Sequence, residues 1–278
     1  MDVRRIAAFS DQEQGGNPAG VVIGDALPEP SVMQSVAAEV GFSETAFAAP
    51  EGEGWRVRYF SPESEVPFCG HATIALGAAL AMDNGDGVYP LHLNAAEISV
   101  EGRRNGAGFS AALQSPPTRS RPADEALRAE AKALFGLADA DLDPRIPVAV
   151  AEAGATHLVL ALTNRALLAA MDYDFKAGQD FMNRHGLVTV SLVYAETPRL
   201  FHARNAFASG GVFEDPATGA AAAALAGYLR DLDWPHGGAI DIVQGEDMGM
   251  LSRLNAQIPA EKGASIRVSG AARLMENA

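Results

Sequence analysis

Two segments of the 278-residue chain are small and apolar on every side. They read GHATIALGAALAM (Gly70 to Met82) and TGAAAAALAGYL (Thr218 to Leu229), and each has the composition of a helix. A helix without a polar face has to be buried all round, so other elements must enclose it. The sequence therefore predicts two similar halves, each with its own buried central helix.

The segments around the two helices have the composition of strands. Alternating or continuous apolar runs occur on both sides of each helix, at residues 3–9, 20–23, 42–48, 55–60, 156–162, 187–195, 200–206, 239–243, 253–258 and 265–268. An amphipathic helix is expected from Pro30 to Gly41, where proline suits the first turn and glycine the end. The predicted fold class is α+β, with each half a curved, mostly antiparallel sheet wrapped around its helix.

The division between the halves is expected near Pro116 and Pro117. The stretch SPPTRSRPADEA, residues 115–126, concentrates proline, serine and arginine and interrupts the strand pattern. This gives an N-terminal half at residues 1–116 and a C-terminal half at 117–278, with chain termini that are allowed to cross over between them.

Composition excludes several classes of protein. The formal net charge of −14, without a local basic run, argues against a nucleic-acid partner. One cysteine excludes an intrachain disulfide framework and a multi-cysteine zinc site. No apolar run reaches the roughly 20 residues that span a bilayer, and the N-terminus does not resemble a signal peptide. A cytoplasmic protein that contacts no membrane is the expectation.

The two buried helices begin in a chemically similar way, one after FCGHAT and the other after FEDPATGA. A helix N-terminus presents unpaired N–H groups and a partial positive charge, and small residues let an anion approach them. Two such termini, facing each other across a cleft between the halves, would hold carboxylates from two sides. The alternative is that glycine and threonine only cap the helices, and this pattern alone leaves both open.

Three ionisable residues near these positions are candidates for proton transfer. Glu44 lies at a helix-to-strand junction, and its alternative is a surface glutamate on an edge strand. His71 follows Gly70 at the start of the first buried helix, where it serves either a substrate or the helix end. Asp215 is either a site residue or part of the second helix cap. No further histidine stands at metal-ligand spacing to His71, so no metal site is expected.

Five motifs in this order resemble the phenazine biosynthesis PhzF-like protein family, within the diaminopimelate epimerase fold. They are GNPAGVV (16–22), MQSVAAEVGFSETAF (33–47), RYFSPESEVPFCGHAT (58–73), VFEDPATGAA (212–221) and QGEDMG (244–249). The resemblance covers nearly the whole chain, and the combination of SETAF, CGHAT and EDPATG is specific. It implies two similar halves, each with a sheet around a central helix, as the apolar segments also predict.

The resemblance implies an isomerase without a cofactor, which moves a proton between carbons of a small carboxylic acid. Glu44 is then the general acid/base, and His71 and Asp215 bind and polarise the substrate or assist the proton relay. The residues assigned to substrate binding are Ser43, Gly70, Thr73, Thr218, Gly219 and Ala220. The expected partner is a small carboxylate-bearing substrate, and relatives suggest a homodimer.

The sequence departs from the family pattern at two positions. Ala220 stands where relatives often have serine after the glycine of DPATG, and Met250 stands where many have arginine. Related racemases and epimerases of this fold use two cysteines, whereas this chain has only Cys69. Two alternatives stay open: a racemase or epimerase that uses Cys69 with a non-thiol partner such as Asp215, and a carboxylate-binding protein without catalysis. Phenazine production is one use of the scaffold, and nothing in the sequence selects it.

Overall fold

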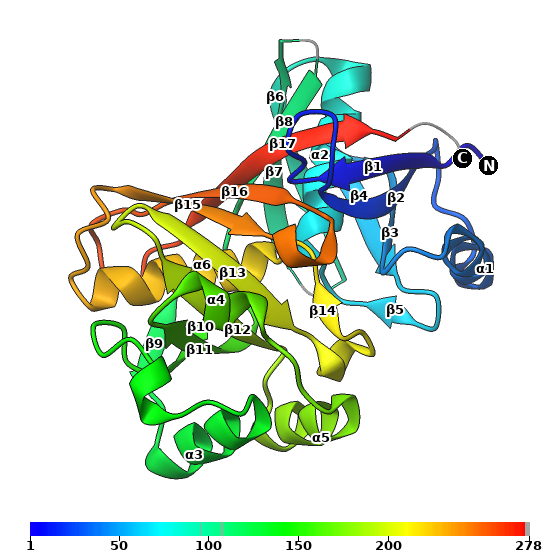
Figure 1. Ribbon diagram of the computed structural model, residues 1–278. Coiled ribbons are helices and arrows are strands. Elements are labelled where there is room, and N and C mark those ends of the chain that lie inside the picture. Colours follow the sequence, from blue (N-terminus) through cyan, green and yellow to red (C-terminus); the bar gives the residue numbers. More distant parts are fainter. Residues whose placement is uncertain (95, 107, 276–278) are drawn as a thin grey trace. The chain divides into compact units, whose positions relative to one another are not determined.

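The computed structural model describes residues 1–94, 96–106 and 108–275, and it divides the chain into two units (Figure 1). The first unit holds residues 1–114 together with the chain from Ser269 onward, and the second holds Ser115–Val268. The expected division near Pro116 allowed the chain termini to cross over between the halves. In the structure the C-terminal stretch belongs to the first unit, because β17 (Arg267–Leu274) pairs with β1 (Arg4–Ala8).

The first unit is a set of paired strands around one helix. Besides β1 and β17, its elements are β2 (Asn17–Ile23), α1 (Pro30–Val40), β3 (Thr45–Glu51), β4 (Gly54–Phe60), β5 (Glu65–Val66), α2 (Gly70–Asn84), β6 (Gly87–His92), β7 (Glu97–Asn105) and β8 (Gly108–Gln114). β1 pairs antiparallel with β2, β2 parallel with β3, β3 antiparallel with β4, β4 parallel with β6, and β6 antiparallel with β7.

The second unit repeats the same series of pairings. Its elements are β9 (Arg119–Pro122), α3 (Glu125–Leu134), β10 (Ala149–Glu152), β11 (Thr156–Leu162), α4 (Arg165–Ala169), α5 (Phe175–His185), β12 (Thr189–Ala195), β13 (Leu200–Ala206), β14 (Glu214–Asp215), α6 (Gly219–Asp231), β15 (Ala239–Gln244) and β16 (Ser252–Gln257). Short 3-10 turns lie at Asp139–Asp141, Ala208–Gly210 and Glu246–Met248. β10 pairs antiparallel with β11, β11 parallel with β12, β12 antiparallel with β13, β13 parallel with β15, and β15 antiparallel with β16.

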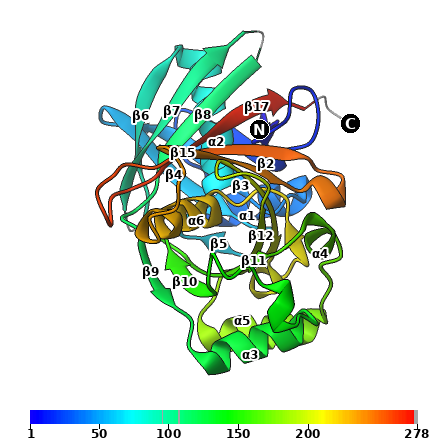
Figure 2. The same cartoon turned by 60° about the vertical axis from the view of Figure 1, so that its left-hand side comes forward.

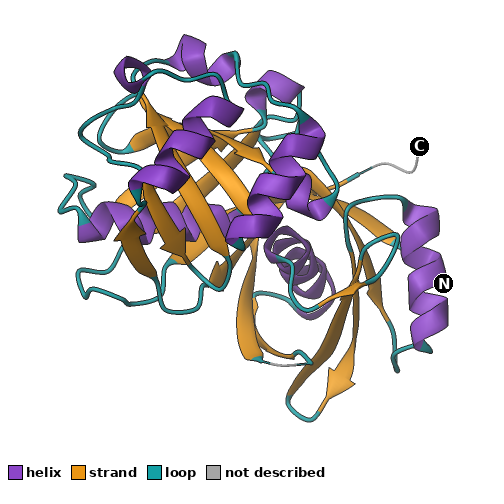
Figure 3. Ribbon diagram, turned by 90° about the horizontal axis from the view of Figure 1, so that it is seen from below, coloured by secondary structure: helices purple, strands orange, loops and turns teal. Residues whose placement is uncertain are grey.

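The two apolar segments are helices enclosed by strands, as their composition predicts. α2 is buried from His71 to Ala81 and contacts β1, β2, β3, β6, β7 and β8. Figure 3 shows orange strands on the flanks of a helix in the first unit, seen there nearly end-on. α6 is buried along most of its length and contacts β9, β10, β11, β15 and β16. The α+β prediction is confirmed.

The other helices of the second unit cover its strands from outside. α3 and α5 lie side by side in Figures 1 and 2, and Arg184 of α5 donates to Glu130 of α3 over 2.7 Å. Apolar residues of both helices share one hydrophobic cluster with β11 and β12, including Leu127, Phe181 and Val190. The strand β9 lies in residues 115–126, where the sequence interrupts the strand pattern. Its pairing with β10 supplies backbone hydrogen-bond partners that the local sequence does not reveal.

The helix α2 and the strand β7 approach each other closely where two glycines face each other. A Cβ atom added at Gly102 of β7 would lie 2.1 Å from the carbonyl oxygen of Gly77 in α2. Only a residue without a side chain permits this contact. We expect Gly102→Ala to lower the free energy of unfolding by about 1–3 kcal/mol, measured by urea denaturation. Gly108→Ala on β8 is the control, since a Cβ there meets nothing nearer than 3.8 Å. Equal losses in the two variants would contradict this packing.

A buried histidine gives the second unit a pH-dependent stability. His157 in β11 is fully buried, its Nδ1 lies 2.8 Å from the hydroxyl of Thr189, and burial lowers its pKa from 6.5 to about 4. The unfolded chain therefore binds more protons between pH 6.5 and pH 4, so stability is complete above this window and falls as the pH drops through it. The full loss is about 3 kcal/mol. We expect His157→Gln to flatten this decline in urea unfolding between pH 7 and about pH 4; an identical decline in both proteins would contradict it.

Candidate active site

Glu44 is held at the junction between α1 and the strand β3. α1 ends at Val40 and is capped by Gly41, which has a left-handed backbone with φ 72°, and β3 begins at Thr45. The strand was expected to start at Phe42, but the residues after Gly41 form regular pairs only from Thr45 onward. The carbonyl oxygen of Glu44 accepts a hydrogen bond from the N–H of Gly20 over 3.1 Å, which fixes the backbone at this point. Its side chain is 15% exposed.

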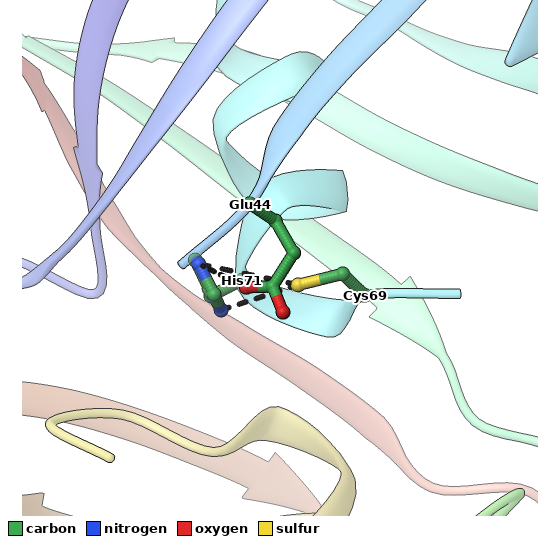
Figure 4. Close-up of side chains that lie close together, drawn as sticks. All are labelled: Glu44, Cys69 and His71. Carbon is green, nitrogen blue, oxygen red and sulfur yellow. Dashed lines mark hydrogen bonds and ion pairs between the residues drawn. The ribbon is translucent and has the colours of Figure 1, made fainter. Parts of the chain in front are cut away.

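His71 and Cys69 lie at the start of α2, next to Glu44. Cys69 is the N-cap residue with an extended backbone, and His71 is buried in the first turn. His71 Nε2 lies 3.4 Å from Glu44 Oε2, and Cys69 Sγ lies 3.3 Å from His71 Nδ1. Figure 4 shows the three side chains pointing toward one another. The fold thus brings together a carboxylate, an imidazole and a thiol.

The hydroxyl of Ser43 contacts the same histidine. Its Oγ lies 3.4 Å from His71 Nε2, the nitrogen that also faces Glu44. A carboxylate beside an imidazole can accept a proton and be oriented while it does so. The first N–H groups of α2, from Gly70 onward, have no partner within the helix and can bind an anion. Ser43 and His71, both expected site residues, therefore lie beside Glu44, and Gly70, a third, directly precedes His71 in α2.

Thr73 has a different place from the other predicted residues. It is completely buried, and its hydroxyl donates to the carbonyl of Cys69 over 2.7 Å. Tyr59 Oη lies 2.7 Å from the hydroxyl oxygen of Thr73. Burial raises the pKa of Tyr59 far above its ordinary value, so this phenol keeps its proton. The Thr73 hydroxyl is thus occupied by protein groups, and it supports the backbone of Cys69 rather than facing solvent.

The start of α6 in the second unit is tied together by polar side chains. The hydroxyl of Thr218 donates to Asp215 Oδ2 over 2.5 Å. The amide of Gln244 donates to the Asp215 carbonyl over 2.7 Å and to Thr218 Oγ1 over 3.1 Å, and its oxygen accepts the Thr218 N–H. Asp215 and Thr218 therefore lie together, and Gly219 and Ala220 follow as the first residues of α6.

Gln244 is the residue that sequence reasoning missed. It stands in the motif QGEDMG without a predicted role, although it is only 1% exposed and its amide binds both Asp215 and Thr218. An amide between the apolar strand residues Ile242–Val243 and a glycine was the available signal, since a buried amide needs hydrogen-bond partners.

Glu214, the neighbour of Asp215, is paired within the protein. Its carboxylate accepts hydrogen bonds from Nε and Nη2 of Arg204 and is buried together with them. The guanidinium also donates to the carbonyls of Ala169 and Met171. Glu214 is thus a structural residue, and its ion pair fixes β14, which carries Asp215, against β13.

No helix in the part of the chain that the structure describes is long and apolar enough to cross a membrane.

Comparison with known proteins identifies the family. Residues 6–278 match the phenazine biosynthesis-like protein family, PhzC-PhzF. The chain is 32% identical to a trans-2,3-dihydro-3-hydroxyanthranilate isomerase from Pseudomonas aeruginosa, over 95% of this chain and 94% of that protein. It is 30% identical to an uncharacterized isomerase from Mesorhizobium japonicum, over 94% and 92% of the two chains.

A solved structure shows the same fold. The crystal structure of a phenazine biosynthesis protein of the PhzF family from Bacillus anthracis superposes with a TM-score of 0.86, at 22% sequence identity, covering 99% of this chain and 96% of that one. Since the family match spans nearly the whole chain and the similar proteins of known class are isomerases, the chain belongs to the phenazine biosynthesis-like PhzC-PhzF family and is an isomerase of that family.

Proposed function

We propose that this isomerase moves a proton between two carbons of a small carboxylic acid without a cofactor, with Glu44 as the general acid/base. The observation that carries the proposal is the position of the Glu44 carboxylate, 15% exposed and 3.4 Å from the imidazole of His71. Glu44 takes a proton from one carbon, and the resulting carbanion is delocalised within the substrate. The same carboxyl then returns the proton to another carbon, so that it is restored as a carboxylate.

Other groups in this proposal bind the substrate and its developing charge. His71 and the hydroxyl of Ser43 orient the Glu44 carboxylate or the substrate oxygen beside it. The N–H group at Gly70, at the start of α2, is proposed as a donor for a carboxylate oxygen of the substrate. Asp215 and Thr218 are proposed as the polar pair that assists substrate binding.

The proposed substrate class is supported by the relative in Pseudomonas aeruginosa, whose name specifies a dihydrohydroxyanthranilate. We propose a small, unsaturated or amino-substituted carboxylic acid of this kind. Ala220 and Met250 differ from the serine and arginine that resemblance to the family leads one to expect, so the ring substituents are expected to differ from those of that relative's substrate. The test is a panel of such acids incubated with the protein in deuterated water, with NMR to find which C–H bond exchanges. Exchange in no member of the panel would contradict the proposed class.

One observation favours a second candidate function, a racemase that uses Cys69. Its Sγ lies 3.3 Å from His71 Nδ1, a contact that can activate a thiol. If Glu44 is the base, Cys69→Ala keeps turnover within about tenfold of the wild type, less than the loss of a general base costs. If Cys69 is the base, the same change removes turnover. Steady-state kinetics on the substrate found by the exchange panel separates the two.

A further inference from the structure

We propose that Glu44, Cys69 and His71 form a binding site for one thiophilic divalent cation of the Zn²⁺ type. A carboxylate oxygen, an imidazole nitrogen and the thiol sulfur of these residues all lie within 4.8 Å of one another. Among the described residues, these three form the one group of three or more His, Cys, Asp or Glu side chains whose donor atoms are that close together.

The donor atoms lie at or slightly beyond the separations of a tetrahedral zinc site, and all of them are within 4.8 Å of one another. Bonds of about 2.0 Å to nitrogen or oxygen and about 2.3 Å to sulfur place neighbouring ligands about 3.3–3.8 Å apart. His71 Nε2 lies 3.4 Å from Glu44 Oε2 and 3.9 Å from Cys69 Sγ. Small side-chain adjustments would therefore place all three donors on one ion.

The donor set selects the kind of metal. Sulfur, imidazole nitrogen and a single carboxylate suit Zn²⁺, Co²⁺ or Cd²⁺, whereas Mg²⁺ and Ca²⁺ prefer oxygen ligands. Three protein ligands leave a fourth position for water or for a substrate carboxylate. Cys69 and His71 are buried and Glu44 is 15% exposed, so the ion would enter from the side of Glu44.

The supporting contacts hold these donors in place. Thr73 donates to the carbonyl of Cys69, and the Glu44 backbone is bonded to Gly20. Metal binding would release the thiol proton of Cys69 to solvent and would change no oxidation state. The sequence predicted no metal site, because no second histidine stands at ligand spacing to His71. The fold brings the possible ligands Glu44 and Cys69 together although they lie 25 residues apart in the sequence.

A bound cation would inhibit the isomerase, and this consequence rests on the proposed function of Glu44. A carboxylate that coordinates Zn²⁺ cannot accept a proton from the substrate. The site would thus make the enzyme sensitive to free zinc, as a reversible inhibitor that chelation removes.

The test measures metal binding without substrate, so that it does not depend on the proposed reaction. The full-length protein is titrated with Zn²⁺ against a chromophoric chelator, and with Co²⁺ while the sulfur-to-metal charge-transfer absorption is recorded. Cys69→Ser and Glu44→Gln are compared with the wild type after circular dichroism has shown that each is folded. His185→Gln is the matched control, because His185 Nε2 lies 3.2 Å from Glu130 Oε2 in a histidine–carboxylate pair without sulfur.

We expect one equivalent of Zn²⁺ in the wild type and in His185→Gln. Each of the other two variants should weaken binding by at least about tenfold, the lower end of what an outer-shell change alone costs. The Co²⁺ charge-transfer band should vanish in Cys69→Ser. Equal Zn²⁺ affinity in the wild type and Cys69→Ser, or no stoichiometric binding, would overturn the metal site and leave the proposed function untouched. Zn²⁺ binding by a protein whose Glu44→Gln variant keeps full turnover would support the site and reject the proposed function.

Discussion

Replacing Glu44 with glutamine is expected to lower kcat by about 10²–10⁴-fold, the usual contribution of one general acid/base. Glutamine has nearly the same size as glutamate, so the contact of 3.4 Å to His71 Nε2 can be kept, but an amide does not accept a proton at neutral pH. The free energy of unfolding should change by no more than about 1 kcal/mol, because the carboxylate is partly solvated and the side-chain volume is unchanged. Steady-state kinetics and urea denaturation of the same preparation check both statements.

A matched control comes from the helix just before this site. Glu39 is an exposed glutamate of α1, and Glu39→Gln makes the same chemical change away from the cluster. It should leave kcat and stability unchanged. A folded Glu44→Gln protein with the turnover of Glu39→Gln would remove Glu44 from the mechanism.

Replacing Glu214 with alanine is expected to lower the free energy of unfolding by about 3–5 kcal/mol, the usual cost of leaving one member of a buried ion pair alone. The side chains of Arg204 and Glu214 are 10% and 4% exposed, and the guanidinium Nε and Nη2 lie 3.0 Å and 2.5 Å from carboxylate oxygens. Without Glu214, the positive charge of Arg204 keeps only backbone carbonyls as partners. Guanidinium denaturation at pH 7 measures the loss.

The exposed pair between Lys176 and Asp180 of α5 is the comparison. These side chains are 71% and 55% exposed, so Asp180→Ala should cost less than about 1 kcal/mol. The double change Arg204→Met with Glu214→Leu should recover more than half of the loss, since it removes both charges together. If Glu214→Ala cost no more than Asp180→Ala, the ion pair would not stabilise β14.

The central helices were predictable because their composition leaves only one solution. α2 and α6 lack a polar face, and burial inside strands is the one arrangement that satisfies them. α1 was equally clear, since Pro30 and Gly41 mark its two ends. By contrast, β7 ends in the exposed residues Arg103, Arg104 and Asn105, so its alternation is weak and its pairing with β8 could not be recognised locally.

The contacts of the candidate site could be predicted only in part. Family motifs identified Glu44 and His71 as site residues, and the structure places them 3.4 Å apart. That Cys69 joins them depends on the pairing of β2 with β3 and on the path of the chain into α2, which is tertiary information. Thr73 and Gln244 show the same limit, because only the folded chain reveals which polar groups their side chains satisfy.

The most direct test of the role of Glu44 is the rate at which solvent deuterium enters the substrate. Wild type, Glu44→Gln and Cys69→Ala are compared on the acid found by the exchange panel, with mass spectrometry to count the deuterium atoms. Proton transfer by Glu44 predicts that Cys69→Ala incorporates deuterium at close to the wild-type rate and that Glu44→Gln loses incorporation by about 10²-fold or more. Incorporation that survives in Glu44→Gln and is lost in Cys69→Ala would contradict it and assign the proton transfer to the thiol.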